Sequence, residues 1–343
     1  MKKAFRAVMA GALLTACGIG GPAQAADVTL RFSHFWPATS AQHTEIFQRW
    51  AETVQKESNG RIEVQVFPAQ TLTKAAASYD AVKSRIADMT ATAQGYVANR
   101  FPLSQVIELP GLIESAAQGS CIEQTLYDEG LIKGEYEDTH VLFVFTHGPG
   151  TLHMKGGAVR APQDLVGKRV RRPTPVVGEL LEAVGAQPVG IPAPEVYQAL
   201  QRGVIDGIAI TFEGGYVFRL NELADTHSDI NLYTLAFVVT MNKQVYQSLS
   251  PDLKAVIDNN SGQKWASIAA AVFDELDRKG LADVKARGHE VVTLSAEEKQ
   301  AVWGPVLKRT TESYLQELED TGKPARKVYE RAVALAGSTC AAK

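Results

Sequence analysis

Residues 27–67 read DVTLRFSHFWPATSAQHTEIFQRWAETVQKESNGRIEVQVF. Apolar and polar residues alternate over 28–32, which predicts a half-buried strand, and the same period returns at 62–66. Between these segments, residues 41–57 place their apolar side chains on one helical face, and Asn59-Gly60 ends that helix. A strand, a helix and a strand form a βαβ unit, whose right-handed crossover makes the two strands parallel.

The alternation of strands and helices continues through both halves of the chain. The run at 141–145 is apolar throughout, which is typical of a strand buried on both faces. The expected strands are 87–93, 141–145, 168–172, 188–191, 208–212 and 236–242, and the expected helices are 76–87, 175–184 and 194–201. The sequence therefore predicts an α/β protein of two halves, each with a mostly parallel sheet.

One helix is expected to be much longer than the others. Ser250 and Pro251 mark its start, and apolar residues recur at helical spacing from Leu253 to Leu276. The pattern indicates about 30 residues, well above the usual 11–12, with a bend at Gly262. It is too polar for a membrane span, so we expect a long helix packed across both halves.

The first 25 residues have the organisation of a signal peptide. Basic residues in the first six positions precede a short apolar run, and Ala23-Gln24-Ala25 reads as a cleavage site. In a competing interpretation, residues 14–17 (Leu-Thr-Ala-Cys) resemble a lipobox, and Cys17 would be acylated. Both alternatives place the fold in the periplasm, either soluble after cleavage or lipid-anchored through Cys17.

Cysteine usage fits an oxidising compartment. Once Cys17 is removed or lipidated, only Cys121 and Cys340 remain. They form either a disulfide that ties the C-terminal tail to the body or two separate thiols. Two cysteines cannot build a structural zinc site, and the sequence contains no C-x-x-C or H-E-x-x-H motif.

Composition excludes several classes of protein. The chain has 343 residues, of which 45% are hydrophobic and 21% are charged, with a formal charge of −3. No basic cluster indicates nucleic-acid binding. The chain has no nucleophile elbow, no Walker A loop and no G-x-G-x-x-G after a strand. We therefore expect no enzyme, no cofactor and no metal.

Several motifs follow one another in a characteristic order. They are LRFSH (30–34), FPAQTL (67–72), IADM (86–89), ELPGL (108–112), DLVGKRVRRP (164–173), EVYQALQRGVIDG (195–207) and Met241-Asn242 before the long helix. Together they resemble the solute receptors of TRAP transporters, the tripartite ATP-independent periplasmic systems (the DctP-type family), over about residues 27–325.

The resemblance implies a two-lobed periplasmic binding protein fold with a cleft between the lobes and a long helix spanning both. We expect residues 26–148 plus 236–276 to form lobe I and 149–235 plus 277–325 to form lobe II, with 326–343 as a C-terminal tail. The hinges are expected near 147–150 and 233–237. Closure follows because the ligand contacts both lobes and so binds the closed state more tightly.

The resemblance also implies that an arginine clamps the ligand's carboxylate, and matching spacing assigns this role to Arg171. A guanidinium fork pairs with a carboxylate through two charge-assisted hydrogen bonds. Arg169 and Arg172 are the rival candidates. Sialic-acid receptors of the family have an arginine where this chain has Thr151 and an asparagine where it has Ile210, so sialic acid is not the expected ligand.

Further cleft candidates lie at strand ends, where α/β sheets place their ligands. Phe212 is expected either to stack on the ligand or to pack in the core, and Glu213 to accept from a ligand hydroxyl or to hold Arg171. The remaining candidates are His34, Trp36, Gln94, Tyr96, Thr151, His153 and Phe237.

The sequence thus predicts an extracytoplasmic receptor that binds an organic acid, an apolar or aromatic monocarboxylate, and delivers it to the small and large membrane subunits of a TRAP transporter. We expect a monomer that binds no nucleic acid. The alternatives are an ABC-type or sensor-linked periplasmic receptor for a small organic anion, and, at lower rank, a secreted hydrolase or isomerase or a structural or chaperone protein.

Overall fold

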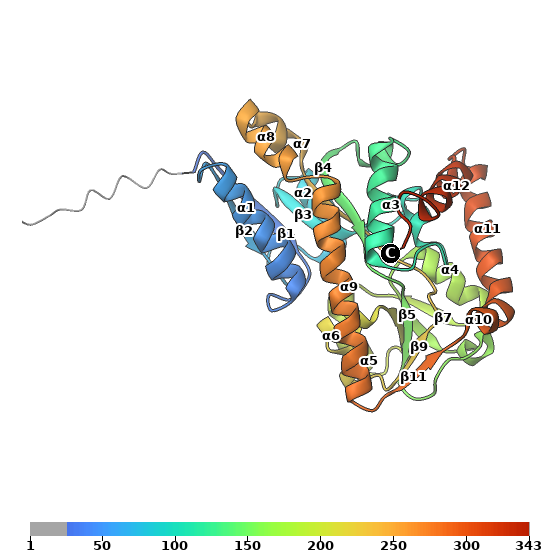
Figure 1. Ribbon diagram of the computed structural model, residues 1–343. Helices are drawn as coiled ribbons and strands as arrows, with labels where there is room; N and C mark the ends of the chain where they lie inside the picture. The colour runs from blue at the N-terminus through green and yellow to red at the C-terminus, as the bar shows by residue number, and fades with distance from the viewer. Residues whose placement is uncertain (1–25, 343) are drawn as a thin grey trace, which may run out of the picture.

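The computed structural model describes residues 26–342, so the expected signal peptide and Cys17 lie outside the described residues. The described chain forms two lobes, each with one sheet covered by helices (Figure 1). The lobe I sheet has the order β2-β1-β3-β10-β4, with β1 (Val28–His34), β2 (Ile62–Phe67), β3 (Met89–Ala93), β4 (Thr139–Thr146) and β10 (Ala236–Asn242). The lobe II sheet has the order β11-β9-β5-β8-β6-β7, with β5 (Thr151–Met154), β6 (Arg169–Arg172), β7 (Gln187–Gly190), β8 (Gly207–Ile210), β9 (Thr226–Asp229) and β11 (Glu290–Thr293).

Helices cover both sheets. They are α1 (Arg49–Glu57), α2 (Ser78–Lys83), α3 (Ala116–Asp128), α4 (Pro175–Ala183), α5 (Ala193–Gln201), α6 (Phe212–Val217), α7 (Lys243–Ser248), α8 (Pro251–Asn259), α9 (Gln263–Ala286), α10 (Ala296–Val302), α11 (Gly304–Asp320) and α12 (Ala325–Ala336). The predicted α/β class and two-lobed architecture are therefore confirmed.

The βαβ unit at the N-terminus has the predicted form. β1 pairs with β2 in parallel, and Val28 lies opposite Ile62. The helix between them begins as a π-helical segment, η1 (Gln42–Gln48), and continues as α1. The ring of Phe32 on β1 packs edge-on against Trp50 of α1, with centroids 5.9 Å apart.

Each sheet contains one strand that runs against all the others. β10 is antiparallel to both of its neighbours, β3 and β4, and β5 is antiparallel to β8 and β9. The other pairings are parallel. The sheets are mixed in pairing but mostly parallel in strand direction, and each reversed strand is the one that the chain enters from the opposite lobe.

The two connections between the lobes lie side by side and pair with each other. The chain leaves lobe I after β4 through 147–150 and returns from β9 through 230–235. Gly150 donates its N–H to Tyr233 O at 2.7 Å, and His147 donates its N–H to Leu235 O at 3.3 Å. These connections occupy the positions expected for the hinges.

The long helix differs from the prediction in its length. A single helix of about 30 residues is wrong, because α8 ends at Asn259 and α9 begins at Gln263. Gly262 separates them with a φ of +65°, in the left-handed region that favours glycine. α9 still has 24 residues and packs against α3 and β4 of lobe I and α6 of lobe II, as Figure 1 shows.

The C-terminal segment packs back onto lobe I. α12 contacts α3, and Cys340 forms a disulfide with Cys121 of α3 across 219 positions of sequence. Of the two alternatives that the sequence left open, the structure shows the disulfide. No helix among the described residues is long and apolar enough to cross a membrane.

We predict that Cys340→Ser destabilises the folded protein. A disulfide restricts the unfolded chain, more so for a long loop, and its loss typically costs about 2–5 kcal/mol. Chemical unfolding should therefore show a lower midpoint than the wild type, and the double variant with Cys121→Ser should match the single one. A midpoint equal to that of the wild type would contradict a bond formed in the native protein.

Candidate functional site

A small cavity of about 30 Å³ lies between the lobes beside the two connections. Lobe I, lobe II, both connections and α9 all contribute to its wall. The lining residues are Phe35, Trp36, Tyr96, His147, Arg171, Ala193, Ile210, Thr211, Glu213, Gly214, Phe218, Tyr233, Leu235, Phe237 and Phe273. The wall is thus mostly apolar, with a few convergent polar groups, as is usual for a small-molecule site.

Arg171 supplies the cationic side chain of this cavity, and it is only 1% exposed. Its Nε donates to Ile191 O and its Nη1 to Ala209 O, both at 2.8 Å, and its Nη2 donates to the Tyr96 hydroxyl at 3.2 Å. Within residues 26–342, no carboxylate lies within 4.0 Å of the guanidinium. Because a buried charge without a counter-ion is costly, the site lacks one anionic group.

The rival arginines do not line the cavity. Arg169 forms an ion pair with Asp206 at 2.6 Å on the surface. The side chain of Arg172 packs near Gly178 and Gly190, and it does not line the cavity. Their positions support the prediction that selected Arg171 from this strand.

Aromatic rings form the wall that lobe I and α9 contribute. Phe35 stacks on Trp36 with centroids 3.9 Å apart, and Trp36 lies 5.4 Å from Phe237. Phe237 in turn lies 5.6 Å from Phe273 of α9. Such a wall suits a flat apolar body, since aromatic pairs prefer stacked or edge-to-face contacts.

Two polar contacts bridge the lobes at the cavity. Tyr96 follows β3 in lobe I, and its hydroxyl accepts from Arg171 and from the N–H of Ala193, at 2.9 Å, in lobe II. Gln42, the first residue of the π-helical segment η1, donates its amide to the carboxyl group of Glu213 in α6. The lobes are therefore held in a closed arrangement.

Burial keeps the carboxyl group of Glu213 protonated at neutral pH. Desolvation raises its pKa to about 8, although the hydroxyl of Thr211, 2.9 Å away, works in the opposite direction. Nearby Asp277 accepts from the Glu213 N–H at 3.0 Å, and burial raises its pKa to about 6. Arg171 is thus the charged group that faces the cavity at pH 7.

Five of the predicted residues line this cavity, and five do not. Arg171, Trp36, Tyr96, Glu213 and Phe237 line it. Glu213 does so without contacting Arg171, because its carboxyl oxygens are bound to Gln42 and Thr211.

Phe212 lies outside the cavity because its strand ends earlier than predicted. β8 stops at Ile210, and Thr211 caps α6 by accepting from the N–H of Gly214 at 3.0 Å. The ring of Phe212 consequently turns toward His153, with centroids 5.4 Å apart. The structure thus shows the packed alternative for Phe212.

The other four candidates are buried and do not line the cavity. His153 lies 2.6 Å from His227 and donates to Ile210 O at 3.0 Å. His34 lies 3.0 Å from His43, and Gln94 donates to Glu123 at 3.1 Å. Thr151 pairs with Ile210 across the sheet, and its buried hydroxyl has no partner among the described residues.

Several residues that complete the cavity were not among the predicted site residues. They are the hinge positions His147 and Tyr233, together with Phe35, Phe218 and Phe273. The connections between two lobes necessarily border the cleft, so that position was the signal for His147 and Tyr233.

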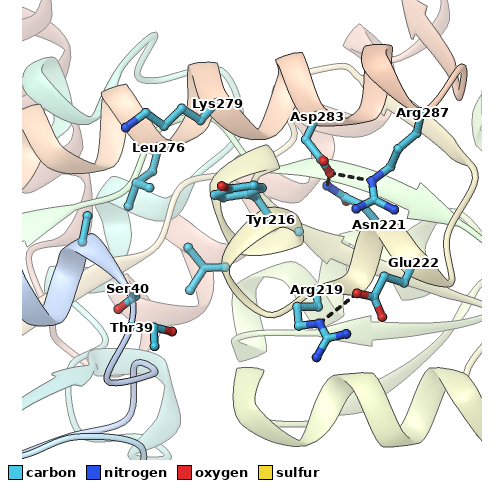
Figure 2. A pocket seen from close by; sticks show the side chains of 13 residues that line it. Thr39, Ser40, Tyr216, Arg219, Asn221, Glu222, Leu276, Lys279, Asp283 and Arg287 are labelled. Atoms are coloured by element: carbon cyan, nitrogen blue, oxygen red, sulfur yellow. Dashed lines mark hydrogen bonds and ion pairs between the residues drawn. The ribbon is translucent and has the colours of Figure 1, made fainter.

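A larger groove of about 450 Å³ lies between α9, α6 and the loop at residues 39–41 (Figure 2). Its arginines are already neutralised: Arg219 pairs with Glu222 and Arg287 with Asp283, both at 2.8 Å. Because these cations have partners and the groove is open to water, it is a poorer carboxylate site than the cavity at Arg171. Among residues 26–342, no cluster of three or more metal-ligating side chains occurs.

The described chain has two lobes, paired connections between them and a buried cation without a counter-ion. These are the features of a two-lobed ligand receptor. The sequence model of "Bacterial extracellular solute-binding protein, family 7" matches residues 32–317, and the chain belongs to this family. The predicted TRAP-type family is confirmed and is favoured over the ABC-type alternative.

Solved structures of TRAP solute-binding proteins share the fold. A marine metagenome protein, specific for aromatic acids and bound to metahydroxyphenylacetate, is 33% identical with a TM-score of 0.86, covering 90% of this chain and 98% of its own. A protein from Rhodoferax ferrireducens with copurified benzoate is 34% identical with a TM-score of 0.85, covering 92% and 99%. The C4-dicarboxylate-binding protein DctP of Rhodobacter capsulatus is 25% identical, covering 87% of this chain and 90% of that protein.

We predict that Gly95→Ala hinders closure of the lobes. A Cβ at Gly95 in lobe I would lie 2.2 Å from the Thr174 side chain in lobe II. Thr174 cannot easily move, because its hydroxyl caps α4. Overpacking of this kind costs about 1–3 kcal/mol, which corresponds to roughly 5- to 150-fold weaker ligand binding.

Titration calorimetry measures this loss. The matched control is Gly134→Ala, where nothing lies within 4 Å of the new Cβ. Equal affinities for the two variants would show that the contact between Gly95 and Thr174 does not limit closure.

We predict that Glu213→Gln changes the pH dependence of stability. The folded protein keeps Glu213 protonated up to a pKa of about 8, whereas the unfolded chain ionises near 4.5. The wild type therefore loses stability as pH rises from about 4.5 to about 8, by at most about 1.4 kcal/mol per pH unit for this group. Glutamine cannot ionise, so the variant escapes this loss.

Urea unfolding of the ligand-free protein at pH 5 and pH 8 measures the effect. The stability of the variant relative to the wild type should be higher at pH 8 than at pH 5. Glu137→Gln, at an exposed position, is the control and should show no such difference. A constant offset for Glu213→Gln would mean that Glu213 is ionised in the folded protein.

Proposed function

We propose that this protein is the periplasmic receptor of a TRAP transporter and that it binds an aromatic monocarboxylate in the cavity at Arg171. The observation that carries the proposal is the buried guanidinium, which has three neutral acceptors and no carboxylate within salt-bridge distance among the described residues. A ligand carboxylate would supply the missing charge through charge-assisted hydrogen bonds.

The charge of the site favours one carboxylate rather than two. With Glu213 protonated, the cavity carries a single positive charge. A dicarboxylate would bring a second negative charge into a wall of Phe35, Trp36 and Phe237, where nothing compensates it. The ligands named for the two structures at 33% and 34% identity, metahydroxyphenylacetate and benzoate, are aromatic monocarboxylates.

The receptor acts by binding and closure rather than by catalysis. Residues 26–148 plus 236–276 form lobe I and 149–235 plus 277–325 form lobe II, and they close about the paired connections. The closed form, bridged by Tyr96 and by Gln42, is the one that a monomeric receptor presents to the small and large membrane subunits. No bond of the ligand is made or broken.

We predict that Arg171→Ala abolishes acid binding. Truncating one partner of a buried charge pair costs about 2–5 kcal/mol, which is roughly 30- to several thousand-fold in affinity. Arg169→Ala is the matched control, because it removes an arginine from the same strand whose guanidinium pairs with Asp206 on the surface. Its affinity should stay close to that of the wild type.

The measurement is titration calorimetry of refolded, ligand-free protein against benzoate, phenylacetate and succinate. Refolding from denaturant removes copurified ligand. The wild type should bind the aromatic acids and not succinate. Wild-type affinity in Arg171→Ala would remove Arg171 as the clamp, and tight binding of succinate alone would overturn the assignment of the ligand class.

A further inference from the structure

His147 occupies a position in the cavity that the carboxylate clamp does not explain. It is the first residue after β4, is 4% exposed and lines the cavity with Arg171. Its ring lies edge-on to Tyr233 and Phe237, with centroid distances of 5.6 and 5.8 Å. These contacts fix the orientation of the imidazole.

The hydrogen bonds of His147 determine which ring nitrogen carries the proton. Nδ1 lies 2.6 Å from Gly148 O, and a carbonyl oxygen only accepts, so Nδ1 is the donor. The hydroxyl of Thr234 donates to the carbonyl of His147 at 2.7 Å and holds this segment in place. In a neutral ring, Nε2 must then bear the lone pair.

The ring is neutral at physiological pH. Burial lowers the pKa of His147 to about 4, and the positive charge of Arg171 acts in the same direction. Within the described part of the chain, no group donates a hydrogen bond to Nε2. His147 Nε2 is therefore a hydrogen-bond acceptor without a donor among the described residues.

A carboxylate cannot satisfy this acceptor, because ionised oxygens carry no proton to donate. An ammonium group on the ligand would be repelled by Arg171, whose charge already acts on the His147 ring. A ligand hydroxyl is neutral and has a proton to donate. It is the group that matches Nε2.

We propose that His147 is a specificity-determining residue and that the ligand is an aromatic monocarboxylate bearing a hydroxyl group, which donates to His147 Nε2. The inference rests on the proposed function, since it takes the carboxylate to be bound at Arg171. Tyr233 contributes a second unpartnered polar group to the same wall: its buried hydroxyl has no partner among the described residues, and the charge of Arg171 acts on it. This hydroxyl can donate to the carboxylate or accept from the ligand.

Calorimetry with pairs of acids tests the proposal. The probes are benzoate with its 2-, 3- and 4-hydroxy derivatives, and phenylacetate with mandelate and 3-hydroxyphenylacetate. In the wild type, at least one hydroxylated acid should bind about two- to tenfold more tightly than its parent, which is the range expected for one neutral hydrogen bond. In His147→Phe, which keeps an aromatic ring but has no lone pair, this ratio should fall to about one.

Two further variants make the result interpretable. Arg169→Ala should keep the wild-type ratio, and His147→Gln, which restores an acceptor, should recover part of it. If His147→Phe does not fold, the wild type labelled with ¹⁵N-histidine gives a second readout. The Nε2 resonance of His147 should move with the preferred hydroxylated acid and not with its parent.

The possible outcomes distinguish a failure of the role of His147 from a failure of the proposed receptor function. If no acid binds the wild type, the proposed function fails. If acids bind at Arg171 without preference for a hydroxyl, if the preference survives in His147→Phe, or if the Nε2 resonance is unmoved, the role of His147 is overturned while the receptor function stands.

Discussion

The buried charge of Arg171 is the constraint on which the rest of the site depends. Its guanidinium is held by two carbonyls of lobe II and by the Tyr96 hydroxyl of lobe I, so the residue that would bind the ligand also joins the lobes. Neutral acceptors orient the charge without neutralising it. The closed arrangement without an anion is therefore electrostatically incomplete, and an anion that pairs with Arg171 stabilises the closed state more than the open one.

The topology allows this exchange between open and closed states because only a few segments link the lobes. The reversed strands β5 and β10 start directly from the connections, which pair through Gly150 and Tyr233. At Gly150, a Cβ would lie 2.1 Å from the Tyr233 ring, so the glycine permits close packing of the two connections. His147 and Tyr233 thus belong both to the connections between the lobes and to the cavity wall.

Sequence patterns predicted the fold better than they predicted the site. Strands such as 141–145 have clear apolar runs. β9, in contrast, reads Thr-His-Ser-Asp and has no apolar pattern from which a strand could be predicted. Its place in the sheet depends on its pairing partners rather than on its own side chains. Arg171 could be selected by motif spacing. The two alternatives for Phe212 could not be separated from the sequence, because a strand-to-helix turn at Thr211 rotates the side chains that follow, and no periodicity reports such a turn. Gln42 was missed because its partner Glu213 lies 171 positions away.

The charge of the proposed site also depends on two buried acids. Glu108 and Glu213 are both buried, and desolvation raises the pKa of each to about 8. Glu108 also accepts from the N–H of Ala236, at 3.2 Å, where the second connection enters β10. Held protonated, they are polar but uncharged, and Arg171 supplies the positive charge of the proposed site. Selectivity for a monocarboxylate would then depend on the desolvation of the groups around Arg171 as much as on Arg171 itself.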